Sequence, residues 1–261
     1  MRRQMRAVKD TVVRPATVCQ PRYAIKKARN GIPLTRWELG GIADNPSYAL
    51  EYALHVVRGR WELGEAAILR SANTAFSYAC NVLGSRWEAG EEVISSCAHS
   101  SLAYASEVVR GRWELGEAAI LSEFEVALKY VKNIVRGRWA PLEEKVLSFV
   151  RRGKKWRWES SSDVVVNYLK AVGRPRWPEL EDVLMEKNRA QVMYRYAVLT
   201  GCRLNADLHQ KMMMFSFDDK RRGWTKRYLR FLDVCERRAV RYLEDLDPEA
   251  RRELVSRIGG V

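Results

Sequence analysis

The sequence has few of the residue patterns on which metal sites and active sites are usually built. Its five cysteines include no C-x-x-C pair, its three histidines are scattered, and no H-E-x-x-H segment occurs. This excludes the common zinc sites and argues against a disulfide framework, so we expect free thiols in a reducing, cytoplasmic compartment. Glycine-rich phosphate-binding loops and G-x-S-x-G segments are also missing. We therefore expect no metal, no cofactor, no catalytic residue and no enzymatic activity.

Long apolar runs are missing as well. No stretch approaches the roughly 20 apolar residues of a membrane helix, and the start, MRRQMRAVKD, lacks the apolar core of a secretory signal. Hydrophobic residues nevertheless make up 47% of the chain and charged residues 30%, as in a folded protein. We expect a folded chain that does not enter a membrane.

Acidic residues are too few to balance the lysines and arginines at the two ends, and the net charge of +14 is concentrated there. Residues 1–21 hold five Lys/Arg and one Asp, and residues 22–149 hold 16 Lys/Arg against 15 Asp/Glu. Residues 150–261 hold 25 Lys/Arg against 16 Asp/Glu. Attraction to an anionic partner is therefore expected at the ends and not in the nearly neutral middle.

An internal repeat occupies that middle. Tryptophans stand at Trp37, Trp61, Trp87, Trp113 and Trp139, at spacings of 24, 26, 26 and 26, and a degenerate copy follows at Trp177. The 14 residues VVRGRWELGEAAIL occur at 56–69 and again at 108–121. Such identity indicates duplication, and a period of this length is typical of stacked repeats.

Each unit predicts two short helices. Tyr stands nine residues before the Trp, Val or Ile five before and Arg directly before, while Glu stands four after. The upstream apolar residues recur at helical spacing, and Gly59 and Gly111 stand where a left-handed helix end is expected. A second helix should begin near the Trp, with Gly64, Gly90 and Gly116 allowing a neighbouring helix to approach. The fold class is therefore all-α, an α-solenoid whose core contains Trp61, Trp87, Trp113, Trp139 and Trp177.

The G-R-W-x-x-x-E unit with its upstream Y-A pair resembles short helical repeats in uncharacterised proteins of large tailed bacteriophages. The resemblance covers roughly residues 22–185. It implies a helical-repeat architecture and a phage or prophage origin, with the host cytoplasm as the compartment. It implies no activity and no site residues.

Three segments follow from these patterns. Residues 1–21 form a basic N-terminal segment, residues 22–185 the repeat array, and residues 186–261 a basic C-terminal helical cap, in which the Trp register fades. A solenoid needs such a cap to close its exposed end. A last helix is expected after Asp247, with Pro248 at its first position.

Two clusters of cations and aromatics are the candidate binding sites, since cations neutralise phosphates and aromatic rings stack on bases. The first consists of Arg151, Arg152, Lys154, Lys155, Trp156 and Arg157, and the second of Lys220, Arg221, Arg222, Lys226, Arg227 and Arg230 around Trp224. The alternative for the first is a worn repeat with Trp158 in the core, and for the second an ordinary charged helix face. The Arg before each Trp could form a phosphate ladder, but pairing with the Glu four residues after the Trp is favoured.

These patterns predict a non-catalytic protein that docks on a macromolecule. The neutral array would bind a protein partner, and the basic ends would contact RNA or DNA, as in a phage host-takeover or anti-defence factor. The alternatives are a pure protein–protein scaffold and a virion structural component. A third alternative is an enzyme with a pocket of carboxylates or histidines between array and cap.

Overall fold

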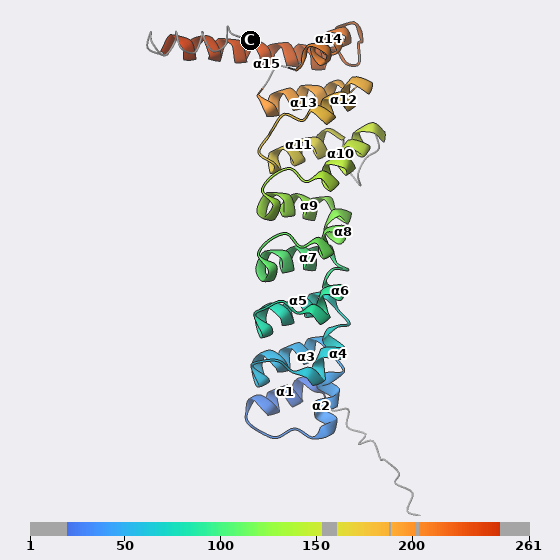
Figure 1. Ribbon diagram of the computed structural model, residues 1–261, viewed down its shortest axis with the longest axis vertical. Helices are drawn as coiled ribbons and strands as arrows, with labels where there is room; N and C mark the ends of the chain where they lie inside the picture. Colours follow the sequence, from blue (N-terminus) through green and yellow to red (C-terminus); the bar gives the residue numbers. More distant parts are fainter. Residues whose placement is uncertain (1–19, 153–160, 188, 202–203, 246–261) are drawn as a thin grey trace, which may run out of the picture. The chain divides into compact units, whose positions relative to one another are not determined.

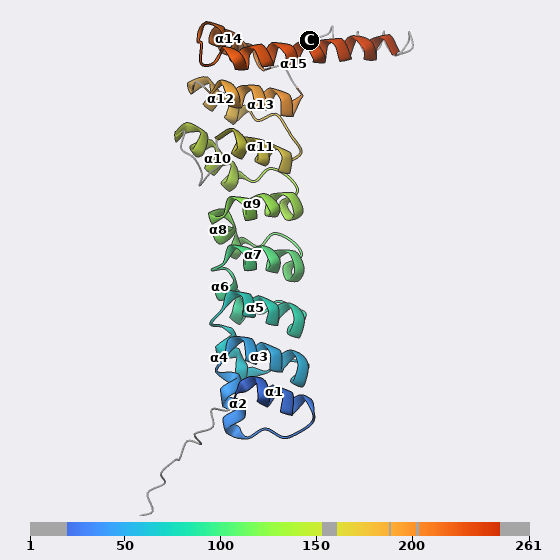
Figure 2. The same ribbon diagram turned by 180° about the vertical axis from the view of Figure 1, so that it is seen from behind.

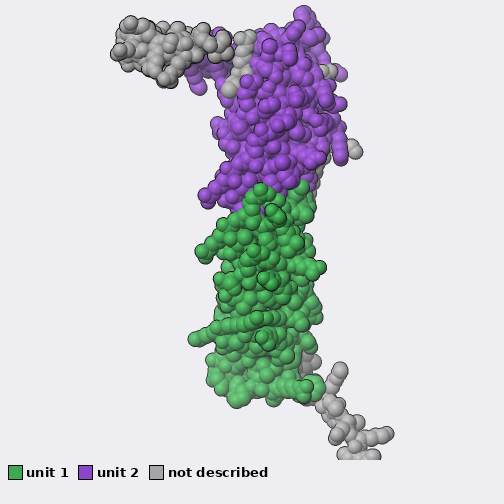
Figure 3. All heavy atoms as spheres, in the orientation of Figure 1, with its two compact units in different colours: residues 1–123 green, residues 124–261 purple. Residues whose placement is uncertain are grey.

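The computed structural model describes residues 20–152, 161–187, 189–201 and 204–245 (Figure 1). In these ranges every regular element is a helix, which confirms the predicted all-α fold. The chain divides into two compact units, residues 1–123 and residues 124–261 (Figure 3). None of the described helices is long and apolar enough to cross a bilayer.

Unit 1 is a stack of four helix pairs, visible from both sides in Figures 1 and 2. The first helix of each pair packs on the first helix of the next, which is the arrangement of a helical solenoid. The first helices are α1 (Pro21–Arg29), α3 (Pro46–Tyr52), α5 (Ala72–Tyr78) and α7 (Ala98–Tyr104). The second helices are α2 (Arg36–Ala43), α4 (Glu62–Ile68), α6 (Glu88–Ile94) and α8 (Glu114–Ser122).

Unit 2 repeats this arrangement with longer helices. Its pairs are α9 (Phe124–Tyr130) with α10 (Ala140–Arg152), α11 (Ser161–Ala171) with α12 (Pro178–Glu186), and α13 (Ala190–Thr200) with α14 (Ala206–Met214). A 3₁₀ turn, η5 (Phe215–Phe217), leads to the 24-residue helix α15 (Arg222–Asp245), which packs on α13. The repeat pairing thus continues beyond residue 185. The helix predicted after Asp247 lies outside the described residues.

The repeated tryptophan stands at the junction between the two helices of a pair. In five pairs it is the residue directly before the second helix, and acidic residues follow in the first turn, where the helix dipole favours them. Trp87, Trp113, Trp139 and Trp177 are 5% exposed or less. Trp61 is half-buried, whereas Trp37 in the first pair is 59% exposed.

The first helix of four pairs ends in a π-helical turn that closes on a left-handed residue. These turns are η1 (Ala53–Val57), η2 (Ala79–Leu83), η3 (Ala105–Val109) and η4 (Val131–Val135). The left-handed residue stands three before the Trp: Arg58, Gly84, Arg110, Arg136 and, in a fifth pair, Arg174. The prediction that Gly59 and Gly111 take this conformation is therefore wrong. A left-handed arginine costs about 1 kcal/mol that glycine would avoid.

The glycine three residues after the Trp is required mainly by that same Trp. A Cβ atom on Gly90 would lie 2.3 Å from Cε3 of Trp87, and one on Gly64 would lie 2.4 Å from Cε3 of Trp61. The neighbouring helix contributes a second contact, because the Gly64 position would also be 3.1 Å from Cβ of Ala49. The predicted close approach of a neighbouring helix therefore contributes less to the need for glycine at this position than the Trp ring does.

Substitution of Gly90 by Ala should therefore destabilise the protein, although alanine favours helices. The Cβ atom collides with the indole ring, and overpacking of this kind costs about 1–3 kcal/mol. Gly111→Ala is the matched control, because a Cβ there meets nothing within 4 Å. Urea denaturation followed by circular dichroism measures both changes. Equal stability of the two variants would contradict the assigned role of Gly90.

Candidate functional site

In five repeats the arginine before the Trp is bound to a glutamate of its own repeat. In unit 1, Nε of Arg86 donates to Oε1 of Glu91 at 2.8 Å, and Nη2 donates to Oε2 at 3.0 Å. This two-point geometry fixes the guanidinium against the carboxylate. The same pair recurs as Arg60–Glu65, Arg112–Glu117, Arg138–Glu143 and Arg176–Glu181. These arginines are therefore structural, as the favoured interpretation of the sequence predicts, and are not a free ladder of phosphate ligands.

A tyrosine of the following repeat completes the network. The hydroxyl of Tyr104 donates to Oε1 of Glu91 at 2.9 Å and accepts the backbone N–H of Trp87 at 3.0 Å. Its ring also packs on Trp113 of its own repeat, with ring centroids 4.7 Å apart. The same hydroxyl contacts are made by Tyr78, Tyr168 and Tyr196. The sequence predicts only that this tyrosine lies on an apolar helix face. Its constant distance of nine residues from the Trp could have indicated that its hydroxyl also takes part in the network.

The network holds its members in defined protonation states. The Arg86 side chain lowers the pKa of Glu91 despite the partial burial of that carboxyl. Burial, with a smaller contribution from the neighbouring Glu65 carboxylate, raises the pKa of Tyr78 to about 12. Burial likewise raises the pKa of Tyr104. The tyrosines are therefore neutral donors to ionised carboxylates.

A further repeat, which lacks the tryptophan, follows the repeat of Trp177 in unit 2. Gly201 takes the left-handed conformation, and Leu204 stands three residues later at the Trp position, 4% exposed. The backbone N–H of Leu204 donates to the hydroxyl of Tyr228 at 3.3 Å, and Nδ1 of His209 lies 3.1 Å from that hydroxyl. Leucine thus stands at the Trp position, and His209, one residue beyond the glutamate position, contacts the tyrosine, so the Trp spacing could not reveal the unit.

The second basic cluster lies at the start of α15, and its cations divide into two groups. Arg221 pairs with Asp218 at 2.6 Å, and Arg222 with Asp219 at 3.4 Å. Lys220 is exposed just before the helix. The side chains of Lys226, Arg227 and Arg230 are exposed, and the structure, in the ranges it describes, gives them no carboxylate partner. The guanidinium of Arg227 lies 4.6 Å from the centroid of the half-buried Trp224 ring.

Only the beginning of the first basic cluster is described. Arg151 and Arg152 are exposed at the end of α10. Lys154, Lys155, Trp156 and Arg157 lie outside the described residues, as does Trp158. Their role in nucleic-acid binding therefore stays a prediction.

A cavity of about 510 Å³ lies in unit 2 beside α14. Methionine and phenylalanine side chains line it together with charged groups: Met185, Asp207, Gln210, Lys211, Met214, Phe215, Asp218 and Arg221. The carboxylate of Asp218 is bound to Arg221 and to the backbone N–H of Lys220, and burial lowers the pKa of Lys211. Among the described residues, no three His, Cys, Asp or Glu side chains lie close enough together to hold a metal ion.

Removal of one network hydroxyl should weaken the stack. Tyr104→Phe keeps the ring on Trp113 but leaves the Trp87 N–H without its partner and removes one hydrogen bond from the Glu91 carboxylate, which keeps those of Arg86. We expect a loss of about 1–3 kcal/mol in the free energy of unfolding. Tyr23→Phe is the control, because Tyr23 is 67% exposed on α1 and should change little. A Tyr104→Phe variant as stable as the control would show that the hydroxyl is dispensable.

Alkaline pH should unfold the array. An unfolded tyrosine ionises near pH 10, whereas Tyr78 stays neutral up to its pKa of about 12. Because the folded pKa is the higher one, this stabilisation is complete below about pH 10 and is lost as pH rises through the folded pKa. Circular dichroism at helical wavelengths and phenolate absorbance should therefore change together in this window. Full ionisation with intact helices would contradict the buried hydroxyl network.

Comparison with known proteins adds no assignment to this geometry. The chain matches no protein-family model, no curated protein and no solved structure. The functional conclusions therefore depend on the side chains themselves: a structural network inside each repeat, exposed cations on α15, and the remaining exposed positions of the array.

Proposed function

We propose that the chain is a non-catalytic helical-repeat protein that docks on a macromolecule, with nucleic acid bound at the basic face of α15. The observation that supports this most is the set of three exposed cations, Lys226, Arg227 and Arg230, on adjacent turns of one helix. No carboxylate among the described residues neutralises them. A phosphate backbone is the partner that such a set attracts most strongly.

The arrangement around Trp224 favours a single-stranded nucleic acid over a purely acidic protein. Arg227 lies over the indole, and the ring of Tyr194 lies 5.8 Å from it between centroids. Aromatic rings beside cations provide surfaces on which unpaired bases stack. Arg222 lies one turn before Lys226, and its exposed pair with Asp219 is worth at most about 1 kcal/mol, so it could turn to a phosphate.

The repeat network supports the non-catalytic part of the proposal. Its arginines, glutamates and tyrosines are the most regular polar groups of the chain, and each is engaged in joining helices. A carboxyl with a lowered pKa beside a neutral tyrosine donates no proton near neutral pH. In a phage setting, such a protein would act by occupying host nucleic acid or a host factor.

Charge reversal on α15 tests the proposal. The variant Lys226→Glu/Arg227→Glu/Arg230→Glu should bind a labelled single-stranded RNA or DNA oligonucleotide more weakly than the native chain. Because three phosphate contacts are lost, the slope of log affinity against log salt should fall by about 2. Fluorescence anisotropy over a salt series measures this, and circular dichroism should confirm unchanged helix content.

The control carries the same change in net charge elsewhere in unit 2. Lys129→Glu/Lys132→Glu/Lys170→Glu alters three exposed lysines on α9, η4 and α11. It should retain most of the affinity. Equal losses in both triple variants, or no retention of oligonucleotide by the native chain at low salt, would favour the protein–protein scaffold instead.

A further inference from the structure

Two strained arginines mark one edge of unit 1. Arg58 and Arg110 are left-handed, with φ of 56° in each case. In the repeat between them the same position is Gly84, with φ of 63°. Glycine therefore satisfies this backbone turn, and the turn itself does not explain why arginine occupies the other two positions.

Contacts within the chain do not explain these arginines either. In unit 2, the equivalent Arg136 donates from Nε to the carbonyl oxygen of Asn133 at 3.3 Å, at the end of its own helix. The side chains of Arg58 and Arg110 are exposed and make no hydrogen bond or ion pair with any residue that the structure describes, although their backbone N–H groups close the helix ends. By contrast, Arg60, two positions later, is bound to Glu65.

The same two repeats also expose a leucine. Leu63 is 60% exposed and Leu115 is 53% exposed, each in the first turn of the second helix of its pair. Leu63 follows Arg58 by five residues, so the two lie within about 17 Å of each other. In the repeat between, the equivalent position is Ala89. The pattern of Arg and Leu, then Gly and Ala, then Arg and Leu again, alternates along unit 1.

Sequence identity between the two repeats is confined to this segment. Residues 56–69 and 108–121 are identical throughout, whereas the 14 residues before each of them, 42–55 and 94–107, match at four positions. A recent duplication alone would leave both stretches alike. Packing fixes the buried positions, but Arg58, Glu62 and Leu63 are exposed, so their repetition points to a shared contact with something outside the chain.

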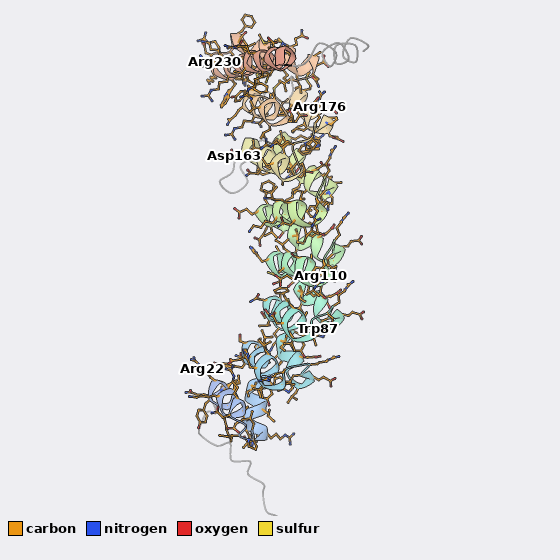
Figure 4. The ribbon with its side chains drawn as sticks, turned by 90° about the vertical axis from the view of Figure 1, so that its left-hand side faces the viewer. Arg22, Trp87, Arg110, Asp163, Arg176 and Arg230 are labelled. Carbon is orange, nitrogen blue, oxygen red and sulfur yellow. The ribbon has the colours of Figure 1, made fainter. Side chains whose placement is uncertain are left out.

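Figure 4 places Arg110 on the same side of unit 1 as Trp87, opposite Arg22 on α1. This side carries anions as well as cations, because Glu62, Glu88 and Glu114 are exposed directly after the tryptophans. A continuous row of phosphates would meet these glutamates and be repelled. A protein segment can instead place a single carboxylate opposite each arginine and an apolar side chain on each leucine.

We propose that this edge of unit 1 binds an acidic, amphipathic segment of a partner protein. Arg58 and Arg110 each take a carboxylate of that segment, and Leu63 and Leu115 each take an apolar side chain. The two contact sets stand two repeats apart and bind the same chemistry twice, so the second contact benefits from the first. This surface is independent of the nucleic-acid site proposed on α15.

Selection from a random linear peptide library on the full chain tests the proposal. We expect enriched peptides to combine Asp or Glu with Leu, Ile or Phe. Their affinity should fall at least about fivefold in Arg58→Gly/Arg110→Gly, as loss of two ion pairs predicts, and also in Leu63→Ala/Leu115→Ala. Glu62→Gln/Glu114→Gln, on the same edge, should bind these peptides equally well or more tightly.

Thermal denaturation separates this role from a structural one. Because Gly84 fits the same turn, Arg58→Gly/Arg110→Gly should melt at the native temperature or above. It should also bind oligonucleotides as the native chain does. Peptide binding therefore tests the edge of unit 1, and oligonucleotide binding separately tests the site on α15. Enrichment of basic peptides, peptide binding unaffected by the arginine variant, a lowered melting temperature, or loss of oligonucleotide binding would each overturn the proposal.

Discussion

The hydrogen bonds of one tyrosine per repeat hold the stack together, and most other features follow from them. In the pair around Tyr104, one hydroxyl accepts a backbone N–H from the preceding tryptophan and donates to a glutamate that the preceding arginine fixes. Hydrogen bonds to charged groups contribute about 1.5–3 kcal/mol each, and loss of one partner leaves the others poorly satisfied. A change in one of the four residues therefore weakens the contacts of the others, which explains why their spacing is so regular.

Helix pairs and their junctions could be predicted from the sequence because they follow from periodicity. The Trp spacing located the second helices, and the Arg–Glu pair was the favoured interpretation of an almost neutral array. The predictions for the individual glycines were wrong or incomplete, because the roles of these glycines depend on how each helix ends and how its side chains pack. Gly59 is the residue that the sequence favours for the left-handed conformation, but the π-helical turn closes on Arg58, whose backbone N–H donates to the carbonyl of Ala53. Gly64 makes room for its own Trp61 ring, a contact that no spacing rule anticipates.

The binding surfaces were harder to predict for a related reason. Clusters of like charge are visible in a sequence, so the basic start of α15 was found, although its division into paired and unpaired cations was not. The edge of unit 1 has no cluster at all. Its arginines are noticeable only because their backbone angles are unfavourable, and its leucines only because they are exposed where an amphipathic pattern would allow burial.

The repeat at Leu204, which lacks the tryptophan, connects the network to the basic face of α15. Here Tyr228 of α15 contacts His209 where the other tyrosines contact a glutamate, and it accepts the backbone N–H of a leucine where they accept that of a tryptophan. In the other repeats the glutamate that accepts the hydrogen bond of the tyrosine is also paired with an arginine, so the charge of that arginine is neutralised. In this repeat α15 joins the array through its buried tyrosine, through a hydrogen bond from the Thr225 hydroxyl to the carbonyl of Met212, and through the contact of Trp224 with Tyr194. The arginines and lysine within one turn of that tyrosine, Lys226, Arg227 and Arg230, are exposed to solvent.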